Sequence, residues 1–168
     1  MRSYIFNTLY IILCILGLQS CKYTFKATSI DPDVESFNVE EFDLRVINAP
    51  PTLGQDFSNA LIEKIQRESR LNLDDTDPHI YFEGAVNRFE VTAPSPEAGD
   101  VTAFNRLNVS VMVDYFKTEK EDKIWSQTFS YFFDFPTDQN LLDVQEEALE
   151  NIYDQLVEDV FNKAFADW

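Results

Sequence analysis

Two neighbouring stretches in which apolar and polar residues alternate constrain the fold of this chain more than any other feature. In the first stretch every second residue is apolar: Leu107, Val109, Val111, Val113 and Tyr115. In the second, one parity is aromatic and the other hydroxylic: Trp125, Phe129, Tyr131 and Phe133 against Ser126, Thr128 and Ser130. Successive side chains of a strand point to opposite faces, so the pattern predicts two strands of a sheet with one buried and one wet face. The polar residues 117–123 are expected to join them as a hairpin.

Two further strands are predicted earlier in the chain. Phe37, Val39 and Glu41 alternate with polar residues and indicate a short strand. The second strand begins at residue 80, and its apolar face would hold Ile80, Phe82, Gly84 and Val86. Phe89 and Val91 fall on the opposite parity, and this change predicts a β-bulge near Asn87 or Arg88.

Two amphipathic helices complete the predicted elements. Thr52 and Gln55 form a capping-box pattern before a helix over 53–70, whose stripe is Leu53, Phe57, Leu61 and Ile65. Its outer face is expected to carry two ion pairs, Glu63 with Arg67 and Lys64 with Glu68. The last helix is expected from about Leu141 to Phe165, with Ala148, Ile152, Leu156, Val160 and Ala164 along its apolar stripe.

The resulting order is β-α-β-β-β-α, and the predicted fold class is α+β. Two helices packed on one face of a four-stranded, mostly antiparallel sheet would bury both helical stripes. The domain is expected to span residues 34–168, after a short tether over 21–33. Its length suits one hydrophobic core.

The first twenty-one residues are typical of a lipoprotein signal. Arg2 supplies a positive charge, and an apolar run from Tyr4 to Leu18 follows it, too short to span a membrane. The run ends in Leu18-Gln19-Ser20-Cys21, which resembles a lipobox except at Gln19. We therefore expect residues 1–20 to be removed and Cys21 to be acylated. A plain secretory signal with an incidental cysteine is the alternative, but a single mature cysteine at the first position favours lipidation.

The charge of the chain argues against polyanionic partners. The chain has 30 Asp and Glu against 13 Lys and Arg, and its net charge is −17. Nucleic acid and anionic membrane surfaces are poor partners for such a chain. Aromatic residues make up 14% of it, so the acids are expected to decorate a folded domain rather than a disordered one.

No catalytic or metal motif is apparent in the sequence, and no cofactor is expected. His79 is the single histidine, and no nucleophile elbow accompanies it, so we interpret it as structural. Asp74, Asp75 and Asp77 lack the glycine and glutamate of an EF-hand loop, and a solvated turn is expected there. The acids of the last helix are interpreted as a solubilising surface, and the chain as a non-enzyme.

The order of elements behind the lipobox resembles the LptE family, the lipopolysaccharide-assembly lipoproteins of the outer membrane. The resemblance rests on Cys21 to Phe25, Pro51 to Leu53, Tyr81 to Gly84, Asn105 to Leu107, Phe129 to Phe135 and Leu156 to Phe161. It covers essentially the whole mature chain, although these are mostly packing residues.

The resemblance implies a lipoprotein anchored on the periplasmic side of the outer membrane. It further implies that the chain plugs the LptD β-barrel, helps it to assemble and assists lipopolysaccharide transport to the outer leaflet. A free-standing lipoprotein that binds another protein or lipid is the alternative, and co-purification with a large barrel would distinguish the two.

Lipopolysaccharide contact is expected at basic residues near the strand ends, because lipid A phosphates require cations. The candidates, matched to the family by region only, are Arg88, Arg106, Lys117, Lys120 and Lys123. The alternative is that they are ordinary solvated surface charges.

Overall fold

The computed structural model describes residues 30–93, 104–118 and 122–166. Within them the chain forms two helices and six strands in one sheet. The elements are β1 (Ser36–Val39), β2 (Asp43–Leu44), α2 (Leu53–Glu68), β3 (Asn72–Leu73), β4 (Ile80–Thr92), β5 (Phe104–Lys117), β6 (Asp122–Pro136) and α3 (Leu141–Phe165). The expected signal peptide, Cys21, Lys120 and most of the loop between β4 and β5 lie outside the described residues.

The sheet is mixed, and the expected four-stranded, mostly antiparallel sheet is wrong in these details. Its order is β3-β1-β4-β5-β6, with β2 also paired to β4. The long strands β4, β5 and β6 are antiparallel, whereas the pairs β1–β3, β1–β4 and β2–β4 are parallel. β1 and β4 run parallel because α2 carries the chain back across the sheet between them. β2 and β3 have two residues each and are too short to show an alternating pattern.

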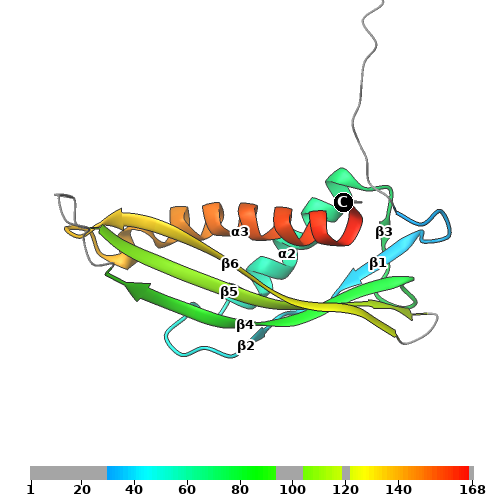
Figure 1. Ribbon diagram of the computed structural model, residues 1–168, viewed down its shortest axis with the longest axis horizontal. Helices are drawn as coiled ribbons and strands as arrows, with labels where there is room; N and C mark the ends of the chain where they lie inside the picture. The colour runs from blue at the N-terminus through cyan, green and yellow to red at the C-terminus, as the bar shows by residue number, and fades with distance from the viewer. Residues whose placement is uncertain (1–29, 94–103, 119–121, 167–168) are drawn as a thin grey trace, which may run out of the picture.

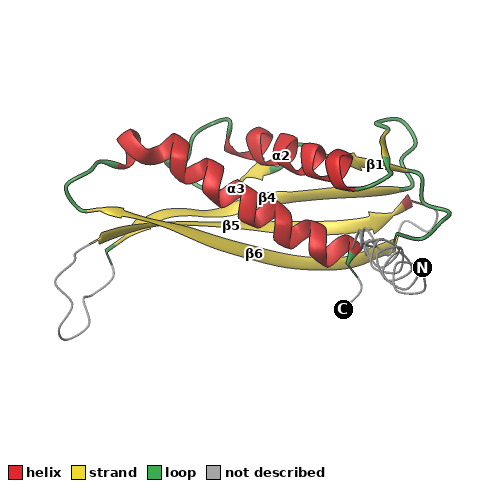
Figure 2. Ribbon diagram, turned by 90° about the horizontal axis from the view of Figure 1, so that it is seen from above, coloured by secondary structure: helices red, strands yellow, loops and turns green. Residues whose placement is uncertain are grey.

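Both helices lie on the same face of the sheet, as predicted (Figure 1). Seen from above, α3 crosses the long strands diagonally, while α2 lies over the part of the sheet that contains β1 (Figure 2). Contacts divide accordingly: α3 packs on β5 and β6, and α2 packs on β1 to β4. We call the helix-covered face the inner face and the opposite one the outer face.

The hydrophobic core lies between the helices and the inner face. The predicted stripe of α2 is fully buried, as are Ile152, Leu156 and Val160 of α3. On β5 the four buried apolar residues are those with the predicted parity: Leu107, Val109, Val111 and Val113. The bulge in β4 is confirmed, because the register with β5 shifts between Val86 and Arg88. It turns Phe89 back toward the core, against which this side chain packs.

Two details of α2 differ from the prediction. Thr52 has a helical backbone (φ −85°, ψ −5°) and its side chain makes no capping hydrogen bond, so the capping box is not formed. A capping residue needs an extended backbone to turn its oxygen toward the first turn of the helix. Lys64 was expected on the outer side of the helix, but it is buried.

Two glycines allow the chain after β1 to pass between α2 and the sheet. A Cβ on Gly54 would lie 2.0 Å from the carbonyl oxygen of Phe42, and one on Gly84 would lie 2.6 Å from the Phe42 ring. Phe42 itself is 2% exposed and stacks edge-on against Phe57 at 4.9 Å between ring centroids. The absence of side chains at Gly54 and Gly84 therefore sets how closely α2 approaches β4.

Candidate functional site

The outer face of the sheet is polar and is covered by neither of the two described helices, which makes it the candidate binding surface. Residues directly opposite each other in an antiparallel pair share a face, so the register places every second residue of β4, β5 and β6 there. Its polar members include Glu83, Glu90, Arg106, Asn108, Ser110, Asp114, Ser126, Thr128, Ser130 and Asp134. The wet side predicted for β6 is confirmed, since Ser126, Thr128 and Ser130 are exposed. On the predicted packed side Phe129 is buried, but Tyr131 is 37% exposed, because it lies near the edge that the helix does not cover.

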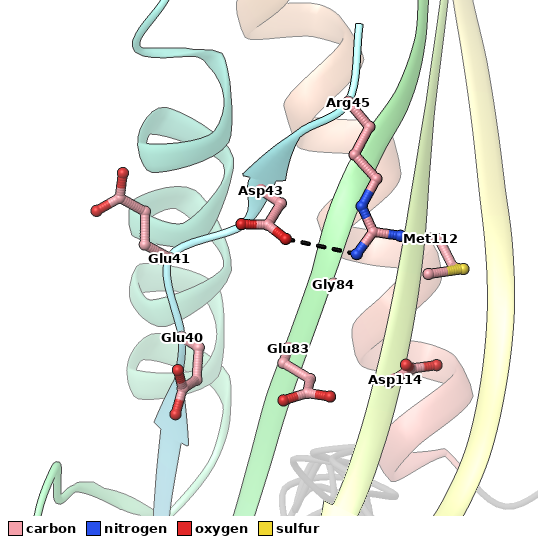
Figure 3. Close-up of a pocket in the computed structure, with 8 residues that line it drawn as sticks. All are labelled: Glu40, Glu41, Asp43, Arg45, Glu83, Gly84, Met112 and Asp114. Atoms are coloured by element: carbon pink, nitrogen blue, oxygen red, sulfur yellow. Dashed lines mark hydrogen bonds and ion pairs between the residues drawn. The ribbon is translucent and has the colours of Figure 1, made fainter.

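An acidic groove of about 210 Å³ opens on this face beside β2 (Figure 3). Its lining residues are Glu40, Glu41, Asp43, Arg45, Glu83, Gly84, Met112 and Asp114. Arg45 reaches across β4 toward Met112, and its guanidinium lies 3.4 Å from the Asp43 carboxylate. Five carboxylates against one cation make the groove a poor place for phosphate and a suitable one for a basic group.

Asp114 is the most buried acid of this groove, with 8% of the residue exposed. Burial alone would raise the pKa of Asp114, but a hydrogen bond from Lys123 and the charges of Lys123 and Arg45 outweigh it and lower that pKa. The Lys123 ammonium donates to Oδ2 of Asp114 at 2.8 Å. Lys123 is thus held against the outer face as the counter-ion of Asp114.

The basic candidates Arg88 and Arg106 lie toward the end of the sheet where the β4–β5 loop begins. Arg106 donates from Nε to Oδ1 of Asp134 at 2.6 Å and from Nη2 to Oδ2 at 2.8 Å. These bonds raise the pKa of Arg106 above its ordinary value. The Phe132 ring lies 3.8 Å from the guanidinium carbon, so the cation is held by an acid and an aromatic face. Arg88 pairs more loosely with Glu90, at 3.5 Å.

Lys117 and Lys123 lie at the opposite end of the long strands. Lys117 reaches Asp31 at 3.4 Å, and Lys123 is the partner of Asp114. Arg106 and Lys117 are eleven positions apart on β5, which corresponds to roughly 36 Å at the rise of a strand. The described candidates therefore form two separate groups, each already paired with carboxylates, and do not make one phosphate site.

Lys64 forms the expected ion pair with Glu68, but its burial and its contact with the last helix were not predicted from the sequence. Its ammonium bonds to Glu158 of α3 and lies 2.9 Å from Glu68, and it stands 5.5 Å from the Phe161 ring centroid. Desolvation alone would lower the pKa of Lys64, but the hydrogen bonds that Lys64 donates to both carboxylates outweigh it and raise that pKa. The signal was present, because residues 57, 61, 64 and 68 follow one helical face.

His79 has a structural place, as we interpreted it. Its Nδ1 lies 2.7 Å from the hydroxyl of Ser36, which also accepts the backbone N–H of His79 at 3.2 Å. Ser36 is 8% exposed, so its oxygen is not offered to a substrate. The Asp74 carboxylate accepts the N–H groups of Thr76 and Asp77, which lowers the pKa of Asp74 and closes the predicted turn.

Over residues 30–93, 104–118 and 122–166 no group of three or more His, Cys, Asp or Glu side chains is arranged to hold a metal ion. Within the same ranges no helix is long and apolar enough to cross a membrane.

Solved structures with a similar fold come from distant bacterial proteins. A hypothetical protein from Chlamydia trachomatis superposes with a TM-score of 0.54 at 9% identity, covering 77% of this chain and 96% of that one. PelC from Paraburkholderia phytofirmans, described as a dodecamer, gives 0.53 at 12% identity and covers 79% and 90%. A Xanthomonas campestris protein gives 0.54 at 11% identity and covers 80% and 87%. These likenesses establish the fold alone.

No curated protein matches the chain in sequence. The family model described as "LptE: Lipopolysaccharide-assembly" matches residues 34–164, which is most of the chain and nearly all of the domain described above. The order of strands and helices, the packing stripes and this match agree, and the chain belongs to the LptE lipopolysaccharide-assembly family.

Proposed function

We propose that this chain is an outer-membrane lipoprotein, anchored through Cys21 on the periplasmic side, that plugs and helps to assemble an LptD-type β-barrel. In that position it assists the transport of lipopolysaccharide to the outer leaflet. The observation that carries the proposal is the family match over residues 34–164, since the LptE family is a non-enzymatic component of lipopolysaccharide transport.

The architecture suits a plug in two respects. The helices and the inner face share one continuous core, which gives a rigid body. The outer face carries hydroxyl, amide and paired ionic groups that need no helix to cover them. A polar face of this kind is compatible with the water-filled lumen of a barrel.

Co-purification tests the proposal directly. Membranes solubilised in a mild detergent should yield the tagged chain together with a large β-barrel protein. Cys21→Ala should leave the domain folded, as judged by circular dichroism, and release it from membranes that lack the barrel, because the acyl chains are the proposed anchor. Purification without a barrel, or membrane retention of the variant when the barrel is absent, would contradict the proposal.

Direct lipopolysaccharide contact is the finer part of the proposal, and it concerns Arg88, Arg106, Lys117, Lys120 and Lys123. Of the four described, Arg106 presents the most ordered donor group, because Asp134 and Phe132 fix its guanidinium. The Asp134 carboxylate must share or give up those donors when a phosphate binds. Because the attraction between the guanidinium and a phosphate is screened by salt, we expect lipopolysaccharide binding to be weak at high salt.

Two sets of variants separate this contact from plugging. Lys117, Lys120 and Lys123 are changed together to Ser, and Arg88 and Arg106 are each changed to Gln. Lipopolysaccharide pull-down at low and high salt should weaken for at least one set. If both sets retain parental binding, phosphate recognition at these residues is excluded, and the role of the chain is to plug and assemble the barrel.

A further inference from the structure

The two edges of the sheet are built differently. One edge ends in β3, which has two residues, and short edge strands are a common protection against unwanted pairing. The other edge is β6, which runs from Asp122 to Pro136 and, among the described strands, pairs with β5 alone. In an antiparallel strand alternate residues turn their N–H and C=O groups away from the neighbour. β6 therefore presents a long row of unpaired backbone donors and acceptors.

The usual protections of a long edge are missing from the middle of β6. No charged residue and no proline occurs from Ile124 to Phe133, although 26% of the whole chain is charged. Large apolar side chains are exposed instead: Ile124 is 52% exposed, Phe132 43% and Tyr131 37%. An uncharged aromatic edge of this length is a template for strand addition.

A groove accompanies this edge on the inner face. It has a volume of about 440 Å³ and lies between β6 and α3, lined by Gln127, Phe129, Asp159, Asn162 and Lys163. A strand added beside β6 would place its inner-face side chains opposite Gln127 and Phe129, at the mouth of this groove. On the outer face the same strand would meet Ser126, Thr128 and Ser130.

We propose that the free edge of β6 is a docking site for an extended segment of the partner barrel protein, which adds to the sheet as a further strand. One set of alternate side chains of the segment faces the groove, where Phe129 is the apolar member of an otherwise polar lining, and the other set lies beside the serine and threonine hydroxyls. A second copy of this chain is disfavoured as the occupant, because two chains of net charge −17 repel each other. The identity of the partner rests on the proposed function.

Hydrogen exchange measured by mass spectrometry tests the site. The full lipidated chain is compared free and in its purified complex with the barrel. The amides of β6 that face away from β5 should exchange rapidly in the free chain and at least about tenfold more slowly in the complex, because each gains a backbone acceptor. Unchanged exchange over residues 124–133 in an intact complex would overturn the inference and leave the proposed function standing.

Edge variants give an independent measurement. Gln127→Lys and Thr128→Lys place a charge on either face of the edge, and both parent side chains are exposed. Gln66→Lys, on the exposed side of α2, is the matched control for the same change of residue. We expect the edge variants to weaken barrel binding by about tenfold, as lysine at an edge opposes strand addition, and the control to bind as the parent does.

The remaining outcomes are also decisive. Parental binding by both edge variants, with their fold verified by circular dichroism, would overturn the inference. Protection of β6 in a dimer of the free chain, detected by light scattering, would replace the barrel with a second copy as the occupant. Failure of the barrel to co-purify would instead refute the proposed function, and with it the assignment of this partner to the edge.

Discussion

The inner and outer faces of the sheet bury residues by different means. On β5, Val111 and Val113 are buried on the inner face by the helices, whereas Ser110 and Asp114 on the outer face are nearly as buried although neither described helix lies above them. Both outer residues are hydrogen-bonded to β6: Ser110 to Ser130 at 2.8 Å, and Oδ2 of Asp114 to Lys123 at 2.8 Å.

The difference shows which face holds the fold together. Each fully buried apolar side chain of the inner face contributes roughly 1.5–3 kcal/mol, whereas an exposed ion pair contributes about 0–1 kcal/mol. Substitutions on the inner face should therefore change stability, and those on the outer face should chiefly change binding. The following predictions test this division, from the largest expected effect to the smallest.

Ile152→Asp should have the largest effect. Ile152 is fully buried in the contact of α3 with the core, and the substitution leaves an unpaired carboxylate there. We expect a loss of about 4 kcal/mol in the free energy of unfolding, measured by urea denaturation. Asn151→Asp, at the exposed neighbouring position, is the control and should cost under about 0.5 kcal/mol. Equal losses of unfolding free energy for the two variants would show that α3 does not pack in the core.

Gly54→Ala tests the close approach of α2 to the chain at Phe42. The added Cβ would lie 2.0 Å from the Phe42 carbonyl oxygen, so the helix must move outward. The expected loss is about 2 kcal/mol, despite the better helix propensity of alanine. Thermal melts measure this loss and that of a control, Asn59→Ala, on the exposed side of the same helix. The control should be neutral or slightly stabilising. A stabilised Gly54→Ala variant would show that the approach is not tight.

Lys64→Met should cost about 1 kcal/mol at neutral pH, because Glu158 and Glu68 lose their buried partner but remain partly solvated. The hydrogen bond from Lys64 is the main reason that the pKa of Glu158 lies below its ordinary value of 4.5. That contribution to stability is present above pH 4.5 and is lost as the pH falls below it.

The acid dependence therefore distinguishes the electrostatic from the packing role of Lys64. Unfolding free energies from roughly pH 6 down to pH 3.5 should fall less steeply in Lys64→Met than in the parent. In the parent the pKa of Lys64 lies above its ordinary value of 10.5. The ion pairs of Lys64 should therefore weaken only as the pH rises beyond 10.5. Parallel acid curves for the two proteins would indicate that Lys64 acts through packing alone.

Outer-face ion pairs should give the smallest changes in stability. Arg106→Gln removes a bidentate pair stacked on Phe132 and should lower the stability slightly, and by less at high salt. Arg88→Gln removes an exposed contact at 3.5 Å and should cost under about 0.5 kcal/mol. Thermal melts in low and high salt compare them. A larger loss of stability for Arg88→Gln would mean that the contribution of an outer-face ion pair does not depend on its exposure.

The long elements were determined by the sequence alone. Both amphipathic helices, the three long strands and the bulge near Arg88 follow from periods of 3.6 and 2 that persist over many residues. The polar placement of Ser126, Thr128 and Ser130 follows from the same alternation.

Tertiary structure decided what depends on contacts between distant residues. β2 and β3 form only because they pair with β4 and β1, respectively. Two residues are too few to show an alternating pattern in the sequence. Lys64 is buried because Glu158, on the other helix, supplies its charge partner. The basic candidates separate into two groups because β5 places Arg106 and Lys117 at its opposite ends. Side-chain period fixes which face a residue occupies, whereas pairing across the chain decides which residues meet there.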